Sequence, residues 1–323
     1  DGYDAFHAPE ALQLVDEYAD GDLRLLGGFR GEQCVGLFPA VVREELSFRL
    51  VLSPPPGLSV PALGPVLMPS SPKRQKQEEL NERFTEGVLE SLGVDDHRTL
   101  FGMGGCPEYA DPRPYEWADL GVVPRFRYVL DLADTDPEAV SNSFSRSLRR
   151  EIQQRDELDV SIDLEGPDAA ERICDDVIRR HAEQGLTYPM PRRFAGDLVD
   201  ALDDRARVYV ARTPDGEFLS GVVVLYAPEK ALFWQGGTRA NYENVSVNSL
   251  LHWEIIQDVL SDPELDAVER YSLGDVTDRD IARYKSKFNP ELAPYYEVKS
   301  TLMTAAKMGY SARRHVLGRL QRL

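Results

Sequence analysis

The sequence predicts a mixed α/β fold made of two related halves. Its 323 residues, 42% of them hydrophobic, can build one large domain or two ordinary ones with a substantial core. Short β-prone runs alternate with amphipathic helical patterns along the chain. A strand, a polar turn and a glycine-containing strand occur at residues 23–41 and again at residues 208–224. We therefore expect an internal duplication.

The elements of the first half follow from local patterns. Leu12, Val15 and Tyr18 supply the apolar face of a helix over residues 6–18. Three β-prone runs with glycine between the first two predict a β-meander at residues 23–28, 34–43 and 47–52. We then expect an irregular Pro/Gly-rich stretch at 53–72, a helix at 73–92, a strand at 99–103, a proline-rich loop at 107–124 and a strand at 126–132.

The second half begins with a helix that Asp136 caps and Pro137 opens. Periodicity then predicts a basic helix at 144–152, strands at 160–164, 208–212, 218–226 and 231–235, helices at 168–184, 194–202, 246–260 and 278–288, and strands at 267–273 and 295–303. Residues 231–260 read as a strand, two glycines and the start of a helix. Such a junction presents free backbone N–H groups to an anion.

The charge composition describes the surface and its partners. The net charge is −18, and only seven of the 37 basic residues are lysine. Abundant Asp and Arg with scarce Lys are typical of a protein that stays soluble in concentrated salt. We expect a halophilic archaeal source, with an acidic mesophilic protein as the alternative. The acidic surface opposes nucleic-acid binding.

Cysteine and histidine usage indicates neither disulfides nor a metal. Cys34, Cys106 and Cys174 are far apart and odd in number, and the five histidines are scattered. No run of 18 apolar residues is present. We expect a cytoplasmic protein, although the start at Asp1 without Met leaves room for a removed targeting segment.

Three segments carry a resemblance to a known family. They are Phe144–Ile152, Trp234–Gly237 followed by Asn248–Ile256, and Tyr271–Gly274 followed by Tyr284–Phe288. In this order and spacing they resemble the GNAT acyltransferase superfamily, and more closely its FemAB-like branch. The resemblance implies two tandem GNAT-like lobes, each a mixed, mostly antiparallel sheet flanked by helices. It places the N-terminal lobe at 1–135, the C-terminal lobe with the acyl-donor site at 136–306 and a basic amphipathic tail at 307–323.

The chain departs from the family pattern at three points. The usual pyrophosphate signature is absent: Gln or Arg, then any two residues, then Gly-x-Gly or Gly-x-Ala. Ser272 stands where Asp is frequent, and Asn289 stands where Gly is usual. These departures put the identity of the donor in question more than the fold.

The resemblance also implies a set of site residues. For the acyl donor they are Gln235, Gly236, Gly237, Asn244, Ser246 and Asn248. Simple N-capping is the alternative for Asn244 and Ser246, and a bulge is the alternative for the glycines.

Candidate catalytic residues are Lys285, Tyr284 and Asp275, which would stabilise negative charge, donate a proton and act as a base. A solvated lysine, a core-edge tyrosine and a turn aspartate are the alternatives. Arg146, Arg149, Arg150 and Trp234 are candidate substrate contacts, and the arginines can instead pair with acidic residues. His252, between apolar neighbours, is expected to be packed rather than catalytic.

These residues predict an acyltransferase that moves an acyl group from acetyl-CoA or another acyl-CoA to an amine of a small molecule or peptide. One alternative is FemAB-type aminoacyl transfer from aminoacyl-tRNA, the only setting in which we expect a nucleic acid as partner. A non-catalytic ligand-binding or scaffold protein is the other. The tail at 307–323 either docks on the acidic body or contacts an anionic membrane surface.

Overall fold

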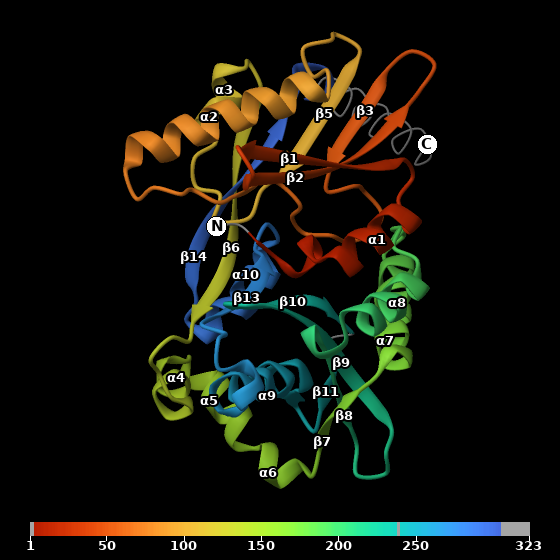
Figure 1. Ribbon diagram of the computed structural model, residues 1–323. Coiled ribbons are helices and arrows are strands. Elements are labelled where there is room, and N and C mark those ends of the chain that lie inside the picture. The colour runs from red at the N-terminus through yellow and green to blue at the C-terminus, as the bar shows by residue number, and fades with distance from the viewer. Residues whose placement is uncertain (1–2, 238–239, 305–323) are drawn as a thin grey trace.

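One continuous sheet runs through the whole molecule (Figure 1). The computed structural model describes residues 3–237 and 240–304. Within them, twelve strands join in the order β1-β2-β3-β5-β14-β6-β13-β10-β9-β8-β7, with β4 added beside β2. The first-half strands are β1 (Asp22–Arg30), β2 (Gln33–Glu44), β3 (Arg49–Ser53), β4 (Val66–Leu67), β5 (Thr99–Gly104) and β6 (Gly121–Asp131).

The second half supplies the remaining strands of the sheet. They are β7 (Ser161–Glu165), β8 (Ala206–Arg212), β9 (Phe218–Ala227), β10 (Lys230–Gly236), β13 (Arg270–Asp275) and β14 (Glu291–Lys299). A separate small hairpin consists of β11 (Asn241–Tyr242) and β12 (Val245–Ser246). The predicted mixed α/β architecture, a large and mostly antiparallel sheet flanked by helices, is confirmed.

Helices cover the sheet on both faces. They are α1 (Pro9–Tyr18), α2 (Arg74–Ser91), α3 (Arg113–Trp117), α4 (Pro137–Ser143), α5 (Arg146–Gln153), α6 (Arg155–Leu158), α7 (Pro167–Glu183), α8 (Arg192–Leu202), α9 (Val247–Ser261) and α10 (Arg279–Lys285). Single turns of 3₁₀ helix are η1 (Ala5–His7), η2 (Asp203–Arg205), η3 (Pro263–Leu265) and η4 (Ser286–Phe288).

The predicted proline-rich loop at 107–124 is wrong in its second part. Helix α3 begins at Arg113, and β6 already begins at Gly121. Pro114 lies in the first turn of α3. Proline is tolerated there because its missing N–H has no intrahelical partner to lose, so proline content alone did not exclude a helix.

The expected duplication appears as one strand order used twice. In each half a helix connects two strands that pair in parallel: β3 with β5 across α2, and β10 with β13 across α9. The other strand pairs of the described chain are antiparallel. We call β1–β5 with α2 and α3 lobe one, and β7–β10 with β13, α9 and α10 lobe two.

The two lobes exchange their last strands. Strand β6 follows lobe one in the chain but pairs with β13 of lobe two, through the register Asp275↔Arg127. Strand β14 follows lobe two but pairs with β5 of lobe one, through Val298↔Met103. The two exchanged strands also pair with each other along nine residues (Figure 1). The expected division at residue 135 therefore separates two stretches of sequence, but the sheet crosses it twice.

Three apolar cores hold these layers together. One lies under α9 and includes Leu250, Tyr271 and Phe288. The second lies under α2 and includes Phe84 and Phe101. The third joins the lobes, because η1 and α1 of the N-terminal segment pack with α7 and α8 against β8–β10. Phe6 and Phe194 both meet the Trp234 ring edge-on there, at centroid distances of 5.8 and 6.1 Å.

The predicted basic tail at 307–323 lies outside the described residues. No helix in the described part of the chain has the length and apolar character needed to cross a membrane.

Candidate active site

Strands β10 and β13 form a fork in lobe two. They pair in parallel at only three positions, from Lys230↔Arg270 to Leu232↔Ser272. Beyond this point β10 stays with β9 as far as Gly236↔Val222, while β13 stays with β6 as far as Asp275↔Arg127. The two strand ends diverge because each follows its own antiparallel partner. The backbone pairing between the two strands therefore ends within the junction predicted at residues 231–260.

Two glycines allow this divergence. Gly274 has a φ of 79°, in the left-handed region that disfavours side chains, and it lies at a register shift of β13. A Cβ added at Gly236 would come within 2.7 Å of the Phe233 ring. The bare backbone of Gly236 thus lets Phe233 lie along the fork.

Lys285, the last residue of α10, fills the fork. It is 8% exposed, and its Nζ donates a hydrogen bond to the backbone oxygen of Asp275 at 3.0 Å. The same atom lies 5.6 Å from the centre of the Phe233 ring. Burial lowers the pKa of Lys285 to about 8, because desolvation disfavours the charged amine. The solvated-lysine alternative does not fit this position.

Asp275 joins Lys285 to the exchanged strand β6. Its side chain is 47% exposed at the end of β13, and Oδ1 accepts a hydrogen bond from Arg127 Nε at 3.1 Å. Lys285 and Asp275, both predicted as catalytic, are thus brought together. Arg127 was not predicted.

A buried polar pair lies behind Lys285. His252 of α9 and Tyr271 of β13 share a hydrogen bond of 2.8 Å between Nδ1 and the hydroxyl. Burial, followed by the Lys285 charge, lowers the pKa of His252 to about 3. His252 is therefore a neutral, packed residue, as expected. The hydroxyl of Tyr284, the third predicted catalytic residue, lies 3.5 Å from Ser249 Oγ of α9.

The start of α9 is occupied by side chains of the protein. Asn248 Oδ1 accepts a hydrogen bond from Ser220 Oγ at 3.0 Å. Ser249 Oγ donates to Glu151 Oε2 at 2.7 Å, and Lys287 Nζ lies 3.3 Å from Glu151 Oε1. A carboxylate thus lies against the first turn, where the helix dipole favours negative charge.

The N-capping alternative holds only in part. Ser246 occupies the N-cap position of α9, but its side chain makes no capping bond within the described residues. Asn244, with a φ of 68°, follows Glu243, with a φ of 47°. Two consecutive left-handed residues form the type of turn that joins β11 to β12, so a backbone requirement accounts for Asn244.

Gln235 and Trp234 point away from the fork. Gln235 is 6% exposed, and its Oε1 accepts a hydrogen bond from Tyr188 at 3.0 Å. Trp234 is 8% exposed, and its Nε1 donates to the backbone oxygen of Ser59 at 2.9 Å. Both side chains brace the core between the lobes. Gly237 closes the end of β10 through a 2.9 Å bond to the oxygen of Gly221.

The three arginines of α5 lie toward solvent. Arg146 and Arg150 are exposed and Arg149 is half-buried, while Leu148 on the opposite side is buried. Arg149 donates to the oxygen of Asn142 at 3.4 Å. None of the three has an ion-pair partner among the described residues, so the alternative of pairing with acidic residues does not hold there.

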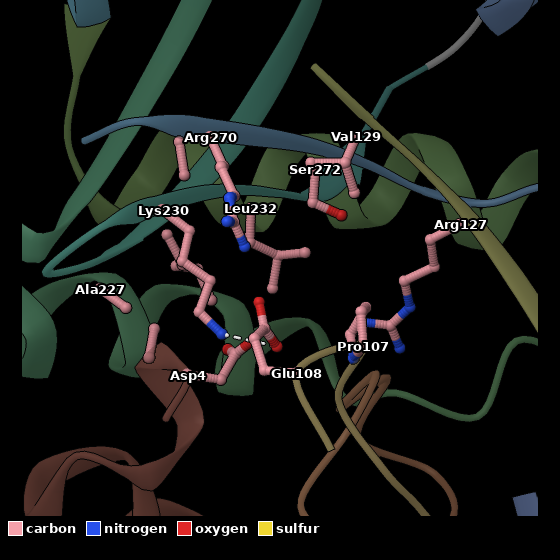
Figure 2. A pocket seen from close by; sticks show the side chains of 13 residues that line it. Asp4, Pro107, Glu108, Arg127, Val129, Ala227, Lys230, Leu232, Arg270 and Ser272 are labelled. Atoms are coloured by element: carbon pink, nitrogen blue, oxygen red, sulfur yellow. Dashed lines mark ion pairs between the residues drawn. The ribbon is translucent and has the colours of Figure 1, made fainter. Parts of the chain in front are cut away.

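A small charged cavity of about 30 Å³ lies beside the paired end of the fork (Figure 2). Leu232 and Ser272, the last paired residues of β10 and β13, both line it. Asp4, Glu108, Lys230, Arg127 and Arg270 supply its charges. Lys230 and Glu108 form an ion pair of 3.2 Å. Asp4 is 5% exposed, and its Oδ1 has no hydrogen-bond partner within the described chain.

The family assignment rests on the segment that contains the fork. Residues 142–286 match the family model described as "Acetyltransferase (GNAT) domain". The match is confined to this segment, which includes β10, α9, β13 and Lys285, so lobe two contains the part of the chain that is similar to a GNAT domain. The described residues contain no cluster of three or more metal-ligating side chains.

Solved structures share the fold of this chain over nine-tenths of its length. "Crystal structure of FemX" aligns with a TM-score of 0.68 at 10% identity, covering 91% of this chain and 92% of the other. The C-terminal domain of a putative lysylphosphatidylglycerol synthetase from Agrobacterium fabrum aligns with a TM-score of 0.55 at 13% identity, covering 90% and 91%. L-PGS from Bacillus licheniformis gives 0.55 at 11%, covering 91% and 92%. No curated protein matches the sequence. At these identities the likeness describes the fold alone.

Three charged side chains of the site escaped sequence reasoning. Arg127 lies in a segment that was assigned to lobe one, and Glu151 sits among the arginines of α5. Lys230 could have been found from the sequence, because it is one of only seven lysines in the chain, as is Lys285. Arg127 had none, since its partner Asp275 is 148 residues away and meets it only through strand exchange.

Proposed function

We propose that this protein transfers an acyl group from an acyl-CoA to an amine at the β10–β13 fork. The observation that carries the proposal is Lys285, a buried amine placed where the two strands part. A donor lying at the fork would bring its carbonyl beside the Nζ atom. Lys285, with a pKa of about 8, is mostly protonated at neutral pH and can donate to that carbonyl oxygen.

The chemistry needs one bond made and one broken. The neutral amine attacks the thioester carbon, a C–N bond forms, and an oxyanion develops that Lys285 stabilises. The C–S bond then breaks and the thiolate leaves, to be protonated by Lys285 or water. Asp275, half exposed at the mouth of the fork, is the base that takes the proton released by the amine.

The charged cavity suits the acceptor amine. It lies against the closed end of the fork and holds two acidic side chains, Asp4 and Glu108. A void of about 30 Å³ holds roughly two waters, so only the amine head of an acceptor would enter. The unpartnered oxygen of Asp4 would then accept a hydrogen bond from the acceptor.

Aminoacyl transfer from aminoacyl-tRNA is the second candidate, and one observation favours it. Glu151 places a carboxylate against the first turn of α9, and Asn248 is engaged with Ser220. Both features oppose a diphosphate at that helix start. The fold shared with FemX and with lysylphosphatidylglycerol synthetase agrees with this alternative. The net charge of −18 opposes it.

Ligand-induced thermal stabilisation in high salt decides between the donors. Acetyl-CoA, longer acyl-CoAs, free CoA and a charged tRNA are added separately. A ligand at 100 times its dissociation constant adds about 2.7 kcal/mol to stability. Stabilisation by a CoA thioester supports the main proposal, and stabilisation by charged tRNA alone replaces it with the second.

Matched variants locate the donor. Ser246→Ala and Asn248→Ala change the start of α9, whereas Ser71→Ala changes the segment before α2 in lobe one. We expect the first two to weaken the CoA response and the third to leave it unchanged. An equal response in all three would place the donor elsewhere.

A further inference from the structure

Arg127 is a buried arginine at the boundary between the lobes. It lies on the exchanged strand β6, and its side chain is only 2% exposed. A buried guanidinium must find partners for several N–H groups, because it stays charged and costs free energy without them. The partners it has therefore indicate what it holds in place.

The side chain contacts three separate segments. Nε donates to Asp275 Oδ1 of β13 at 3.1 Å, and Nη2 donates to the backbone oxygen of Pro61 at 2.7 Å. The guanidinium also lies 4.5 Å from the centre of the Tyr295 ring on β14. Its rigid planar shape can fix three directions at once, which the single ammonium of a lysine cannot.

The contact with Asp275 lies directly beside the reaction centre. Arg127 grips the side chain of Asp275, while the backbone oxygen of the same residue accepts the bond from Lys285. The grip comes from the β6 side, away from β10, and so draws the end of β13 toward β6 and keeps the fork open. Arg127 also lines the charged cavity.

We propose that Arg127 is a positioning residue, which holds the end of β13, and through it Lys285, in place from across the lobe boundary. Its role in turnover rests on the proposed acyl transfer, but its hold on Lys285 can be measured without any substrate.

The charges around Lys285 predict the sign of the effect. Burial lowers its pKa most, Asp275 on β13 raises it, and Arg127 on β6 lowers it. His252 on α9 is neutral, and Phe233 on β10 contributes a ring face. Removing the Arg127 charge takes away a repulsion and leaves Asp275 unneutralised. Both changes raise the pKa of Lys285.

The test measures the pH dependence of Lys285 labelling by an amine-reactive reagent, read by mass spectrometry of the intact folded protein. Arg127→Met is expected to move the labelling midpoint upward by about one pH unit. Asp275→Asn, which removes an attractive charge, is expected to move it downward. Arg127→Lys keeps a charge but cannot reproduce both hydrogen bonds, so its midpoint stays near that of the wild type while kcat falls about tenfold.

Arg207→Met is the matched control. Arg207 is a buried arginine of lobe two, 10% exposed, paired with Asp262 at 2.6 Å and lying over the Tyr226 ring. Its loss costs stability without touching the fork, so the Lys285 midpoint should not move. The proposal is overturned if Arg127→Met has the same Lys285 labelling midpoint as this control. If Arg127→Met does not fold, an Asp275→Asn midpoint at the wild-type value overturns it instead. A shift confined to Arg127→Met and Asp275→Asn supports it even when no acyl donor is turned over, in which case the proposed reaction alone fails.

Discussion

The two lobes use the same strand order to build one closed junction and one open one. In lobe one, β3 and β5 pair along five positions, from Arg49↔Thr99 to Ser53↔Met103. In lobe two, the equivalent strands β10 and β13 pair along three and then diverge. The first junction thus has two more paired positions than the second.

The helix that follows each parallel strand pair also contributes a different kind of side chain in the two lobes. In lobe one α3 contributes Tyr115, which is 1% exposed and stacks on Phe101 at 6.3 Å. In lobe two α10 contributes Lys285. The helix between the paired strands supplies Asn81 in lobe one, bonded to Tyr109 at 2.9 Å, and His252 in lobe two, bonded to Tyr271. Lobe one fills its junction with aromatic packing, and lobe two keeps a titratable centre. The comparison teaches that one strand order can carry two different sets of side chains at equivalent junctions.

Replacing Lys285 should give the largest loss of kcat. If it does not, the proposed difference between the two junctions is wrong. Lys285→Met is expected to lower kcat by about 10²- to 10³-fold, the usual loss for one oxyanion donor. Lys299→Met at the end of β14, which removes a half-buried lysine paired with Glu297, should leave kcat unchanged. Steady-state kinetics with the donor identified by thermal stabilisation provide the measurement. Equal losses in both variants would mean that the fork has no special role.

The same substitution should stabilise the protein. The pKa of Lys285 is lower in the folded state than the ordinary 10.5, so the unfolded chain binds the proton more strongly between pH 8 and 10.5. Below pH 8 the folded state carries the full cost of a buried charge. Denaturant unfolding at pH 7 should therefore show Lys285→Met to be more stable by up to about 3 kcal/mol. A loss of stability would contradict this account of its burial.

Acid should destabilise lobe two through His252. Its folded pKa of about 3 lies below the ordinary 6.5, so stability is full above pH 6.5 and falls as the pH drops toward 3. The slope from this residue is about 1.4 kcal/mol per pH unit. His252→Asn, the residue type found at Asn81 of lobe one, should remove it. Unfolding between pH 6.5 and 5 measures it apart from most carboxylates.

His7 gives an internal comparison for that measurement. Among the described residues it is the other buried histidine of lowered pKa, caused chiefly by desolvation, and it bonds the backbone of Asp4 and Gly64. His7→Gln should also remove a share of the slope. If His252→Asn keeps the wild-type slope, the buried neutral imidazole is not the acid-sensitive group.

Gly274 sharpens the comparison at the level of the backbone. Gly274→Ala forces a side chain onto a φ of 79° and should cost about 1–2 kcal/mol. Gly102→Ala on β5 meets only the ends of two flexible side chains, Leu52 at 3.1 Å and Met303 at 3.6 Å, and has no such φ. We expect Gly274→Ala alone to raise the KM of the donor, because the strain falls at the fork. Equal costs and unchanged KM values would assign Gly274 a purely structural role.

The exposed arginines should give the smallest effect. Arg146→Gln and Arg150→Gln are expected to change unfolding free energy by less than about 0.5 kcal/mol. An anionic acceptor should lose less than about fivefold in KM, since exposed charge pairs contribute about 1 kcal/mol or less. Arg98→Gln in lobe one is the control. An unchanged KM across anionic acceptors would remove α5 from the acceptor site.

Local sequence patterns predicted most elements and the central lysine of the site. The strand, glycine and helix junction at 231–260 was identified from periodicity, and Lys285 from the rarity of lysine together with the family resemblance of Tyr284–Phe288. Asp275 was found because it ends a strand. These signals lie within a few residues of the feature they predict, which is why one sequence was enough.

What escaped prediction depends on pairing between distant segments. The residue patterns of β6 and β14 predict strands but do not say which strands they pair with. The strand exchange and the Arg127–Asp275 contact therefore could not be predicted from the sequence. Gln235 and Trp234 were predicted at the site because the residues that follow them, Gly236 and Gly237, were predicted there. Strand alternation and the register shift near Phe233 turn them toward Tyr188 and Ser59 instead. Asn244 was selected for its side chain, whereas the turn requires its backbone conformation.

The exchange of β6 and β14 makes the chain equivalent to a swapped dimer whose two subunits have been fused. A fragment cut at residue 135 would lose the strand that completes its sheet and expose an unpaired edge, at β5 in one half and β13 in the other. Neither repeat can drift into an autonomous domain while the other decays. Each half therefore depends on the other for a strand of its sheet, and heating should melt the two halves in a single cooperative transition.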